Sequence, residues 1–425
     1  MRQPVRASAV SLAVLLLSIL AVPPVPTGAI QVAWLHQFGT RDADEADGVA
    51  VDPAGNTYVV GQTFGALPGQ SSAGMIDAFI RKYDPAGNEI WTRQFGSAER
   101  DLARGVAVDG AGNAWVVGQT FGSLPGQVSA GGWDAFVRKY DAAGNEVWTR
   151  QFGGGGGETT SEVAIDRGGN AYVVGGTRAA LPGQTSAGDY DAFIRKYDPT
   201  GNELWTRQFG TEAEDYAMAV TLDTAGNPVV AGETGGLLAG AAAAGGLDSF
   251  VRKYDPAGHV LWTRQFGSRL DDFALGAAVA PGGDVYVVGA TEGALPGQKS
   301  AGDSDAYIAA FSADGGDRWA RQFGTEGADD AKAIVFDVTG HPFVAGRAGG
   351  ALLGQPSAGQ ADGFIMATGL TGDTVWTRQF GGPADDYVAG LAVGKGGLYA
   401  AGGTTGALTG QTTAGERDAF VLNVA

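Results

Sequence analysis

Short runs of β-branched and aromatic residues, separated by turn-forming residues, recur along this chain. In the first complete unit these runs cover residues 48–52, 57–61, 77–83 and 89–95. Each run is typical of a strand. Residues 52–56 and 84–88 both read Asp-Pro-Ala-Gly-Asn, a turn sequence in which proline fixes its own φ and Gly and Asn accept the left-handed conformation. The pattern predicts two hairpins in series, which make a four-stranded antiparallel sheet.

The unit repeats without a slip. A tryptophan, followed at a constant distance by Gln-Phe-Gly, occurs every 57 residues, at Trp34, Trp91, Trp148, Trp205, Trp262, Trp319 and Trp376. Propeller blades usually take about 40–45 residues. The excess lies in one connection, residues 64–76, between the second and third strands. We therefore expect seven ordinary blades, each with one long loop.

One unit is divided between the two ends of the chain. Residues 30–39 hold only an outer strand, whereas residues 390–425 hold the three inner strands. Pairing them completes a seventh blade and removes the open ends of the array. We predict an all-β fold, a single seven-bladed β-propeller of four-stranded antiparallel blades closed by the N-terminal strand. The blades are expected at residues 48–96, 105–153, 162–210, 219–267, 276–324, 333–381 and 390–425.

Several segments resemble a known repeat family. They are Gly-Val-Ala-Val-Asp at 48–52, Tyr-Val-Val-Gly at 58–61, Asp-Ala-Phe-Ile-Arg-Lys-Tyr-Asp at 77–84 and Trp-Thr-Arg-Gln-Phe-Gly at 91–96. Together they resemble the SBBP, or seven-bladed β-propeller, repeat, and the first two strands also resemble the NHL-type repeat. The resemblance implies a propeller of the kind found on bacterial exported and cell-surface proteins, including surface-layer-like ones. It supplies no catalytic residues.

Residues 1–29 resemble a secretory signal peptide. Arg2 and Arg6 precede an uncharged stretch, residues 7–22, and small residues end the segment at Ala29. The uncharged stretch is shorter than the roughly 20 residues that span a bilayer. We expect cleavage after Ala29 and an exported protein, whether extracellular, cell-surface or periplasmic, with no membrane insertion of the mature chain.

The charge and the cysteine count narrow the choice of partners. The chain carries a formal net charge of −18 and no cysteine. A negative field repels nucleic acid and anionic lipid, and disulfides and thiolate metal sites are impossible. We expect a monomer whose partner is an extracellular protein or polysaccharide, and no nucleic acid.

Strand direction places the long loops on one rim. Because strands alternate in an antiparallel sheet, the connection of residues 64–76 and the acidic stretch after each Gln-Phe-Gly share a rim, and the tight turns share the other. Ligands of propellers usually meet such displayed loops. Two acidic positions recur on this rim in every unit, exemplified by Asp101 and Asp77. We expect them to hold the glycine-rich loops by accepting backbone N–H groups.

Candidate ligand contacts are aromatic and acidic residues of the same rim. Trp133 and Tyr190 precede the third strand of adjacent blades, Tyr216 follows in the next connection, and Asp101 and Asp215 belong to the recurring acids. Aromatic rings beside carboxylates can stack on sugar rings. The alternative is that these aromatics only cover their own loops.

A calcium site is the one cofactor hypothesis. Asp42, Asp44 and Asp47 precede Gly48 in one connection, and Ca²⁺ takes several oxygen ligands at once. The alternative is a solvated acidic loop, and no other cofactor is predicted.

The sequence offers few side chains suited to catalysis on the looped rim. The three histidines occupy structural places, His36 in an outer strand and His259 and His341 in turns, so no Ser-His-Asp system can form on the looped rim. The leading hypothesis is a secreted or cell-surface, non-enzymatic binding scaffold. The alternatives are a carboxylate-dependent extracellular glycan hydrolase or lyase and a calcium-binding, surface-layer-like protein.

Overall fold

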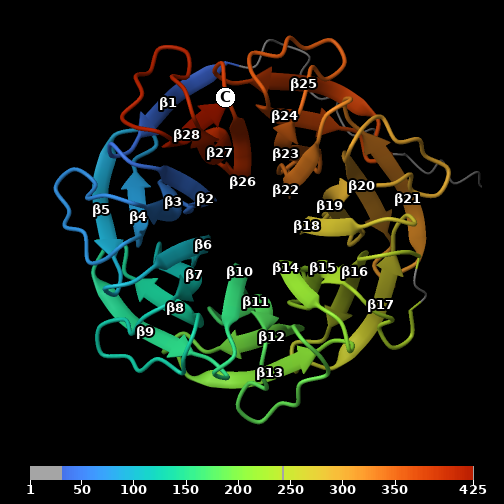
Figure 1. Cartoon of the computed structure of the whole chain (residues 1–425), viewed down its shortest axis with the longest axis horizontal. Helices are drawn as coiled ribbons and strands as arrows, with labels where there is room; N and C mark the ends of the chain where they lie inside the picture. Colours follow the sequence, from blue (N-terminus) through green and yellow to red (C-terminus); the bar gives the residue numbers. More distant parts are fainter. Residues whose placement is uncertain (1–30, 242–243, 425) are drawn as a thin grey trace, which may run out of the picture.

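The structure, a computed structural model, describes residues 31–241 and 244–424. The expected leader, residues 1–29, lies outside the described residues. The described residues form twenty-eight strands in seven four-stranded sheets. The sheets stand radially around a central opening (Figure 1). The predicted seven-bladed β-propeller is confirmed.

Each blade has four strand positions, named A to D from the central channel outward. The A strands are β2 (Asp44–Val51), β6 (Asp101–Val108), β10 (Glu158–Ile165), β14 (Asp215–Leu222), β18 (Asp272–Val279), β22 (Asp330–Phe336) and β26 (Asp386–Gly394). The B strands are β3 (Thr57–Thr63), β7 (Ala114–Thr120), β11 (Ala171–Thr177), β15 (Pro228–Thr234), β19 (Val285–Thr291), β23 (Pro342–Ala348) and β27 (Gly397–Thr404).

The C strands are β4 (Asp77–Tyr83), β8 (Asp134–Tyr140), β12 (Asp191–Tyr197), β16 (Asp248–Tyr254), β20 (Asp305–Phe311), β24 (Asp362–Thr368) and β28 (Asp418–Val424). The D strands are β5 (Glu89–Phe95), β9 (Glu146–Phe152), β13 (Glu203–Phe209), β17 (Val260–Phe266), β21 (Asp317–Phe323), β25 (Thr374–Phe380) and β1 (Val32–Phe38).

The A strands are longer than the sequence pattern predicted. The pattern started the first one at Gly48, whereas β2 begins at Asp44. The ladder continues because a β-bulge absorbs one residue: Ala46 pairs with Gly61 and Gly48 with Val60, so Asp47 has no partner across the sheet. The C and D strands have the predicted bounds.

The N-terminal strand closes the ring as predicted. β1 runs antiparallel to β28, with Leu35 opposite Leu422 and Phe38 opposite Ala419. The seventh sheet therefore has the order β1-β28-β27-β26. In Figure 1 the blue β1 lies beside the red β28.

In five blades one aspartate builds the turn between the A and B strands, and Asp52 is an example. Asp52 Oδ1 accepts the backbone N–H groups of Ala54 and Asn56 at 2.9 and 2.8 Å. Gly55 has a φ of 95°, a conformation that only glycine adopts without strain. The Asp-Pro-Ala-Gly-Asn sequence thus fixes a tight hairpin, as predicted.

Neighbouring blades pack through the Trp, Arg and Phe of the D strand. Trp91 Nε1 donates to the Ala142 carbonyl of the next blade at 3.3 Å, and Arg93 Nε donates to the Gly144 carbonyl at 2.8 Å. Phe95 meets Phe136 edge to face, with ring centroids 5.7 Å apart. A Cβ on Gly144 would lie 2.8 Å from the Trp91 ring, so the indole needs a glycine in the turn that it covers.

The seam between the sixth and seventh blades lacks the turn that the indole covers at the other seams. Six of the seven D-strand indoles donate to a turn carbonyl of the next blade, but no such bond exists for Trp376 among the described residues. Trp376 faces the split blade, in which no hairpin joins β28 to β1. An apolar cavity of about 300 Å³ remains there, lined by Val32, Leu35, Leu422 and Val424 among others.

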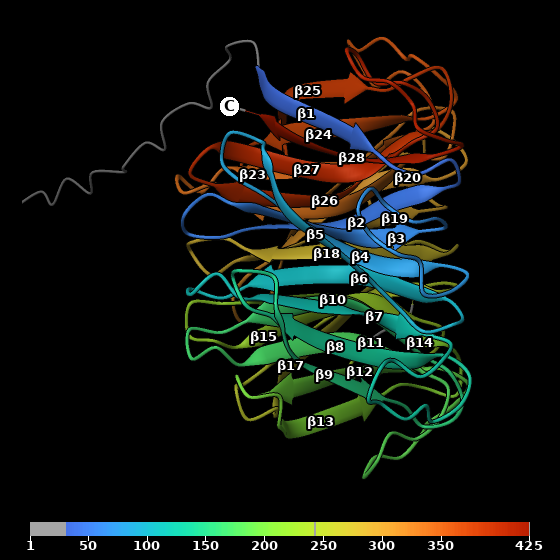
Figure 2. The ribbon, with the colours of Figure 1, turned by 90° about the vertical axis from the view of Figure 1, so that its left-hand side faces the viewer.

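The two rims differ as expected. The looped rim carries the B to C connections, residues 64–76 and their counterparts, together with the D to A connections, residues 39–43 and their counterparts. The plain rim carries the tight turns. Seen edge-on, the longer connections project on the right in Figure 2. No helix in the described part of the chain is long and apolar enough to cross a membrane.

Deleting residues 32–38, the strand β1, should lower the melting temperature by more than about 10 °C and promote aggregation, because it exposes β28 as a free edge. Scanning calorimetry and light scattering measure both effects. His36→Arg, which restores the residue of the other D strands, is the control and should melt like the unaltered protein. Near-identical melting of the deletion variant would contradict the closure.

Candidate functional site

The two recurring acidic positions hold loops, as predicted. Asp77 Oδ2 accepts the Ala73 backbone N–H at 2.8 Å and the Gln94 side-chain amide at 2.7 Å. Asp101 Oδ2 accepts the backbone N–H and the hydroxyl of Ser97 at 2.6 and 3.0 Å. Both carboxylates are fully buried. They anchor the long loops to the blades.

The burial of these acids removes two of the candidate ligand contacts. Asp101 and Asp215 are both 0% exposed, and Asp215 Oδ2 accepts the backbone N–H of Thr211 at 2.6 Å, as Asp101 does with Ser97. The sequence pattern showed where these acids recur but not that the A strand would begin at them and bury them. The ligand hypothesis therefore depends on the aromatic residues.

The buried acids also form pairs across each seam. Asp77 Oδ1 and Asp101 Oδ2 both lie 2.6 Å from the point where a Cβ on Gly96 would stand, so this residue must be glycine. The same arrangement recurs at every seam. The pairs are Asp418 with Asp44, Asp77 with Asp101, Asp134 with Glu158, Asp191 with Asp215, Asp248 with Asp272, Asp305 with Asp329, and Asp362 with Asp386.

The A-strand carboxyl group of each pair has a raised pKa. Burial raises its pKa, hydrogen bonds lower the pKa in part, and the facing carboxylate raises it again. For Asp272 the pKa rises to about 6. In contrast, hydrogen bonds from Asn88 lower the pKa of Asp84, and those from Asn202 and Thr200 lower the pKa of Asp198 to about 2.

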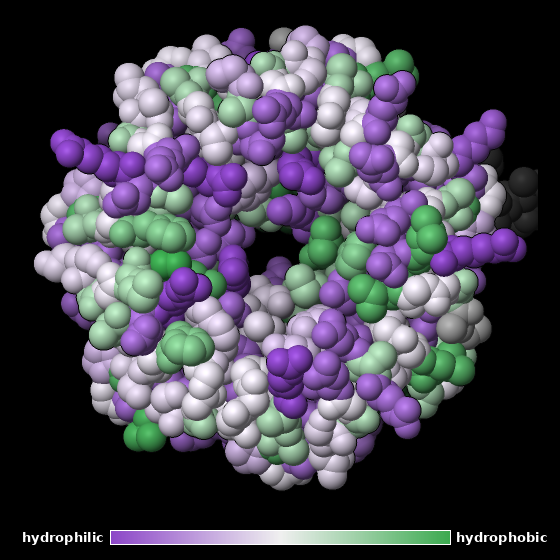
Figure 3. Space-filling model, in the orientation of Figure 1, coloured by the Kyte–Doolittle hydropathy of each residue, from purple (hydrophilic) through white to green (hydrophobic). Residues whose placement is uncertain are grey.

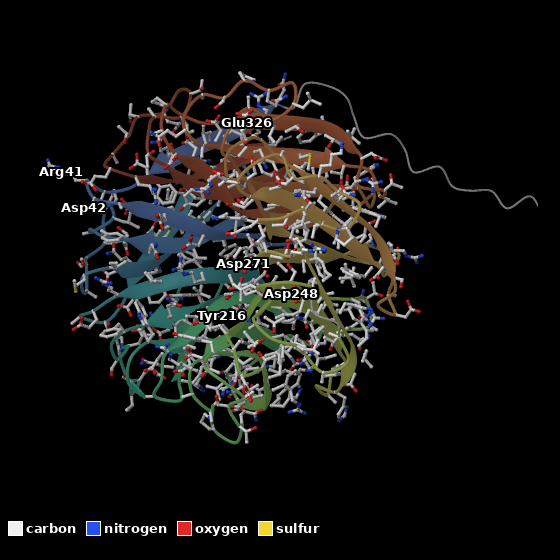
Figure 4. The ribbon with its side chains drawn as sticks, turned by 45° about the vertical axis from the view of Figure 1, so that its right-hand side comes forward. Arg41, Asp42, Tyr216, Asp248, Asp271 and Glu326 are labelled. Carbon is white, nitrogen blue, oxygen red and sulfur yellow. The ribbon has the colours of Figure 1, made fainter. Side chains whose placement is uncertain are left out.

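The three carboxylates of the calcium hypothesis are not brought together. Asp42 is exposed, Asp44 is buried against Thr40, and Asp47 forms an ion pair with Arg104 at 3.2 Å. Figure 4 places Asp42 beside Arg41 at the edge of the molecule. Across the described residues no group of three or more His, Cys, Asp or Glu side chains is arranged to hold a metal ion.

The predicted aromatic residues form a row on the looped rim. The rings of Tyr190 and Tyr216 lie 4.8 Å apart, and the Arg178 guanidinium stands 5.0 Å from the Tyr190 ring centroid. Trp133 packs edge to face on Phe121 at 5.5 Å. All four rings are at least partly exposed. The row therefore continues from blade 2 to the A strand of blade 4.

A glycine shelf joins the two halves of this row. Residues 154–157 are four consecutive glycines, and Gly155 and Gly157 have φ values of 85° and 116°. A Cβ on Gly157 would lie 3.9 Å from the Tyr190 hydroxyl, and one on Gly132, next to Trp133, would lie 3.8 Å from the Gly157 nitrogen. The connection is bare of side chains where the other blades carry acidic or basic residues.

The structure also reveals a ring of residues that sequence reasoning missed. The bulge in each A strand turns one residue toward the central channel. Seven different residue types occupy this position: Asp47, Arg104, Ser161, Met218, Leu275, Lys332 and Ala389. Disagreement among otherwise similar repeats was the signal in the sequence that could have identified them.

The ring surrounds a hollow. The channel contains a cavity of about 480 Å³, and its mouth on the looped rim holds one of about 490 Å³ that shares the ring residues. Tyr216, Gln119 and Glu233 extend the mouth outward. Figure 3 looks onto this face, with hydrophilic residues above the central opening and hydrophobic residues to its right.

Three carboxyl groups of the channel and its mouth are partly buried, and this desolvation raises their pKa values. The pKa of Asp47 rises to about 6, and those of Glu162 and Glu233 to about 7. Arg104 lowers the pKa of Asp47 in part, whereas Glu214 and Asp271 raise that of Glu233 further. Perturbed acids in a cavity are typical of functional sites.

The three histidines lie outside this site. His259 Nδ1 lies 2.8 Å from Asp255 and His341 Nδ1 lies 3.3 Å from Asp337, both within plain-rim turns. His36 stacks on Tyr83 in the seam. They occupy the structural places that the sequence predicted.

Comparison with known proteins supports the fold. The family model described as SBBP, beta-propeller repeat, matches residues 33–67, 90–125 and 147–179, which confirms the resemblance. The crystal structure of the WD40 beta propeller domain of Doa1 is similar with a TM-score of 0.53 and 11% identity, over 92% of this chain and 96% of that one. At this identity the likeness shows the fold alone.

Two curated relatives share part of their length with this chain. Regulatory protein FlaEY of Caulobacter vibrioides is 28% identical over 391 residues, which cover 87% of this chain and 37% of the relative. An uncharacterized WD repeat-containing protein of Acanthamoeba polyphaga mimivirus is 27% identical over 152 residues, 30% of this chain and 11% of the relative. The chain thus spans well under half of either relative.

The seam carboxyl pairs should make stability pH-dependent. Acids whose pKa is raised on folding stabilise the fold fully below about pH 4 and lose this effect as the pH rises through their raised pKa values, which for Asp272 is about 6. The turn aspartates have lowered pKa values and lose their stabilising effect as the pH falls through them, which for Asp198 is about 2. The melting temperature should peak near about pH 4 and fall by roughly 5–10 °C by pH 7. Melting curves followed by circular dichroism between pH 3 and 8 check this.

Asp272→Asn provides the variant for this test, because an amide has the shape of the neutral acid and does not ionise. Its melting temperature should fall less between pH 4 and 7 than that of the unaltered protein. Asp84→Asn, in an exposed turn, is the matched control and should change only the acidic side of the profile. A melting temperature that rises steadily from pH 4 to 7 would refute the role of the pairs.

Proposed function

We propose that this protein is an exported, non-enzymatic binding scaffold that takes an extracellular polysaccharide on its looped rim. The observation that supports this best is the aromatic row. Trp133, Tyr190 and Tyr216 flank a glycine shelf on one rim. Flat apolar ring faces bordered by polar groups suit the alternating apolar and hydroxylated faces of sugars.

The size and shape of the row favour a polymer over a single sugar. The row extends over three blades, and residues 154–157 provide a floor without side chains between Trp133 and Tyr190. Polar groups lie beside it: Arg178 is held by Asp189 at 2.9 Å, and Glu233 borders the mouth next to Tyr216. A chain laid along the row would meet aromatic faces at its ends and hydrogen-bonding groups at its sides.

Export is part of this proposal and is supported by the sequence. The pattern of residues 1–29 resembles a secretory leader. The resemblance to repeats of bacterial exported proteins agrees with it. We propose an extracellular, cell-surface or periplasmic monomer.

A second candidate is a carboxylate-dependent enzyme acting on the same polymers. It is favoured by the raised pKa values of Asp47, Glu162 and Glu233 around the channel. Such chemistry needs two carboxyl groups, one protonated and one ionised. Release of reducing or unsaturated sugar ends from a bound glycan would decide for the enzyme.

A glycan array with the exported form of the protein tests the binding proposal. Trp133→Ala, Tyr190→Ala and Tyr216→Ala should each weaken binding of the selected glycan by roughly 5–30-fold, since each removes about 1–2 kcal/mol of stacking contact. Phe64→Ala is the matched control, because Phe64 is an exposed aromatic residue of the looped rim outside the row. Binding that is unaffected by the three substitutions, or lost equally in the control, would overturn the proposal.

A further inference from the structure

A polar trio lines the seam in front of each of the first three blades. In the first blade, Arg81 Nε donates to the Thr92 hydroxyl at 2.8 Å, and this hydroxyl donates to Glu89 at 2.7 Å. The same bonds recur in the second and third blades. The Arg81 guanidinium also covers the Phe38 ring of the preceding blade, 4.1 Å from the ring centroid. A long side chain therefore fills the seam at this point.

The seventh blade is apolar at all three positions of the trio. The pairing registers place Leu422, Leu35 and Val32 where the first blade has arginine, threonine and glutamate. No other blade has apolar residues at all three positions. Leucine is shorter than arginine, so space remains beside the Phe380 ring, which is the counterpart of Phe38.

This space is the apolar cavity of about 300 Å³ between the sixth and seventh blades. It lies between β25 and β1 at the top of Figure 1. Its lining extends from Val424, at the plain-rim end of β28, to Pro356 in a loop of the looped rim. An apolar cavity of about 150 Å³ holds benzene, so this one has room for a chain of roughly eight carbon atoms.

Two donors border the cavity without a partner among the described residues. They are Trp376 Nε1 and the guanidinium of Arg378, two residues apart on β25. At the next seam but one along the chain, the counterparts Trp91 and Arg93 donate to turn carbonyls at 3.3 and 2.8 Å. Arg378 is exposed and is the one charged residue in the described lining of the cavity. The missing turn thus leaves a positive group beside an apolar space.

We propose that this seam cavity binds a fatty carboxylate of medium chain length. Its acyl chain lies against Leu422, Ile365 and Phe380, and its carboxylate accepts hydrogen bonds from Arg378 and Trp376. A carboxylate at the end of an apolar chain matches the single charge and the apolar walls of the cavity.

A peptide turn of the kind that fills the other seams suits these walls less well. It would bring several backbone N–H and C=O groups against Leu35, Leu422 and Val424, which offer them no hydrogen bonds. An acyl chain has no such groups to desolvate. The site is separate from the aromatic row and takes a different class of ligand, so the proposal does not depend on polysaccharide binding.

Titration calorimetry with octanoate, butanoate, 1-octanol and octylamine tests the proposal. Octanoate should bind at least about tenfold more tightly than butanoate, which buries four fewer methylene groups. It should also bind at least about tenfold more tightly than 1-octanol and octylamine, which lack the carboxylate for Arg378. Undetectable octanoate binding, or equal affinity for octanoate and any of the other three compounds, would overturn the proposal.

Variants locate the site. Leu422→Arg combined with Leu35→Thr gives the seventh blade the residues of the fourth, Arg252 and Thr263, which are hydrogen-bonded at 2.9 Å. The double variant is therefore expected to fold and to fill the cavity. It should weaken octanoate binding at least about tenfold, with unchanged circular dichroism.

Arg378→Gln removes the charge and should also weaken octanoate binding at least about tenfold. Arg264→Gln is the matched control, because Arg264 is the counterpart of Arg378 at the seam between the fourth and fifth blades. It should bind octanoate like the unaltered protein. Unaltered affinity in the double variant or in Arg378→Gln, or an equal loss in the control, would refute the assignment to this cavity.

Discussion

Burial of both faces of every blade is the constraint on which this structure depends. The C strands are buried along their whole length in all seven blades, and each B strand is buried at all but at most two positions, as β4 and β7 show. A four-stranded sheet can cover both faces only if it has a neighbour on each side. Because the neighbour is another copy of the same sheet, the contacts of Trp91, Arg93 and Phe95 are repeated at seam after seam. Ring closure by β1 extends this protection to the last blade.

The same constraint separates structural from functional positions. Residues that contact the next blade must be alike in all copies, so Asp77, Gly96 and Asp101 recur and are buried. Positions that face the channel or the loop surface touch no identical partner and are free to differ. The ring that contains Asp47 and the aromatic row around Tyr190 are such positions. In a repeat protein, divergence between copies is therefore better evidence for a ligand site than recurrence.

Much of the fold could be predicted from the sequence, because its determinants are local. Blade number, strand order and the rim that carries the long loops could be predicted from three features. They are the tryptophan spacing, the Asp-Pro-Ala-Gly-Asn turns and the strand alternation. The aromatic row was also predictable from its neighbours in the chain. The channel ring was not, because a one-residue bulge at Asp47 decides which side chain faces the opening, and the burial of Asp101 follows from where the A strand begins. Both depend on pairing between strands, which a single repeat does not reveal.

The ring of blades can open at the seam between the sixth and seventh blades. There Trp376 lacks the turn that covers its counterparts, and no hairpin joins the outer strand to its blade. Strand β1 is held by its pairing with β28 and by side-chain hydrogen bonds of Gln37 to Gly406 and Asp418. Separation of β1 from β28 exposes a free edge, so the barrier to that step contributes to the lifetime of the folded protein. For a chain without disulfides, resistance to proteases thus depends on how slowly β1 separates as well as on how stable the ring is at equilibrium.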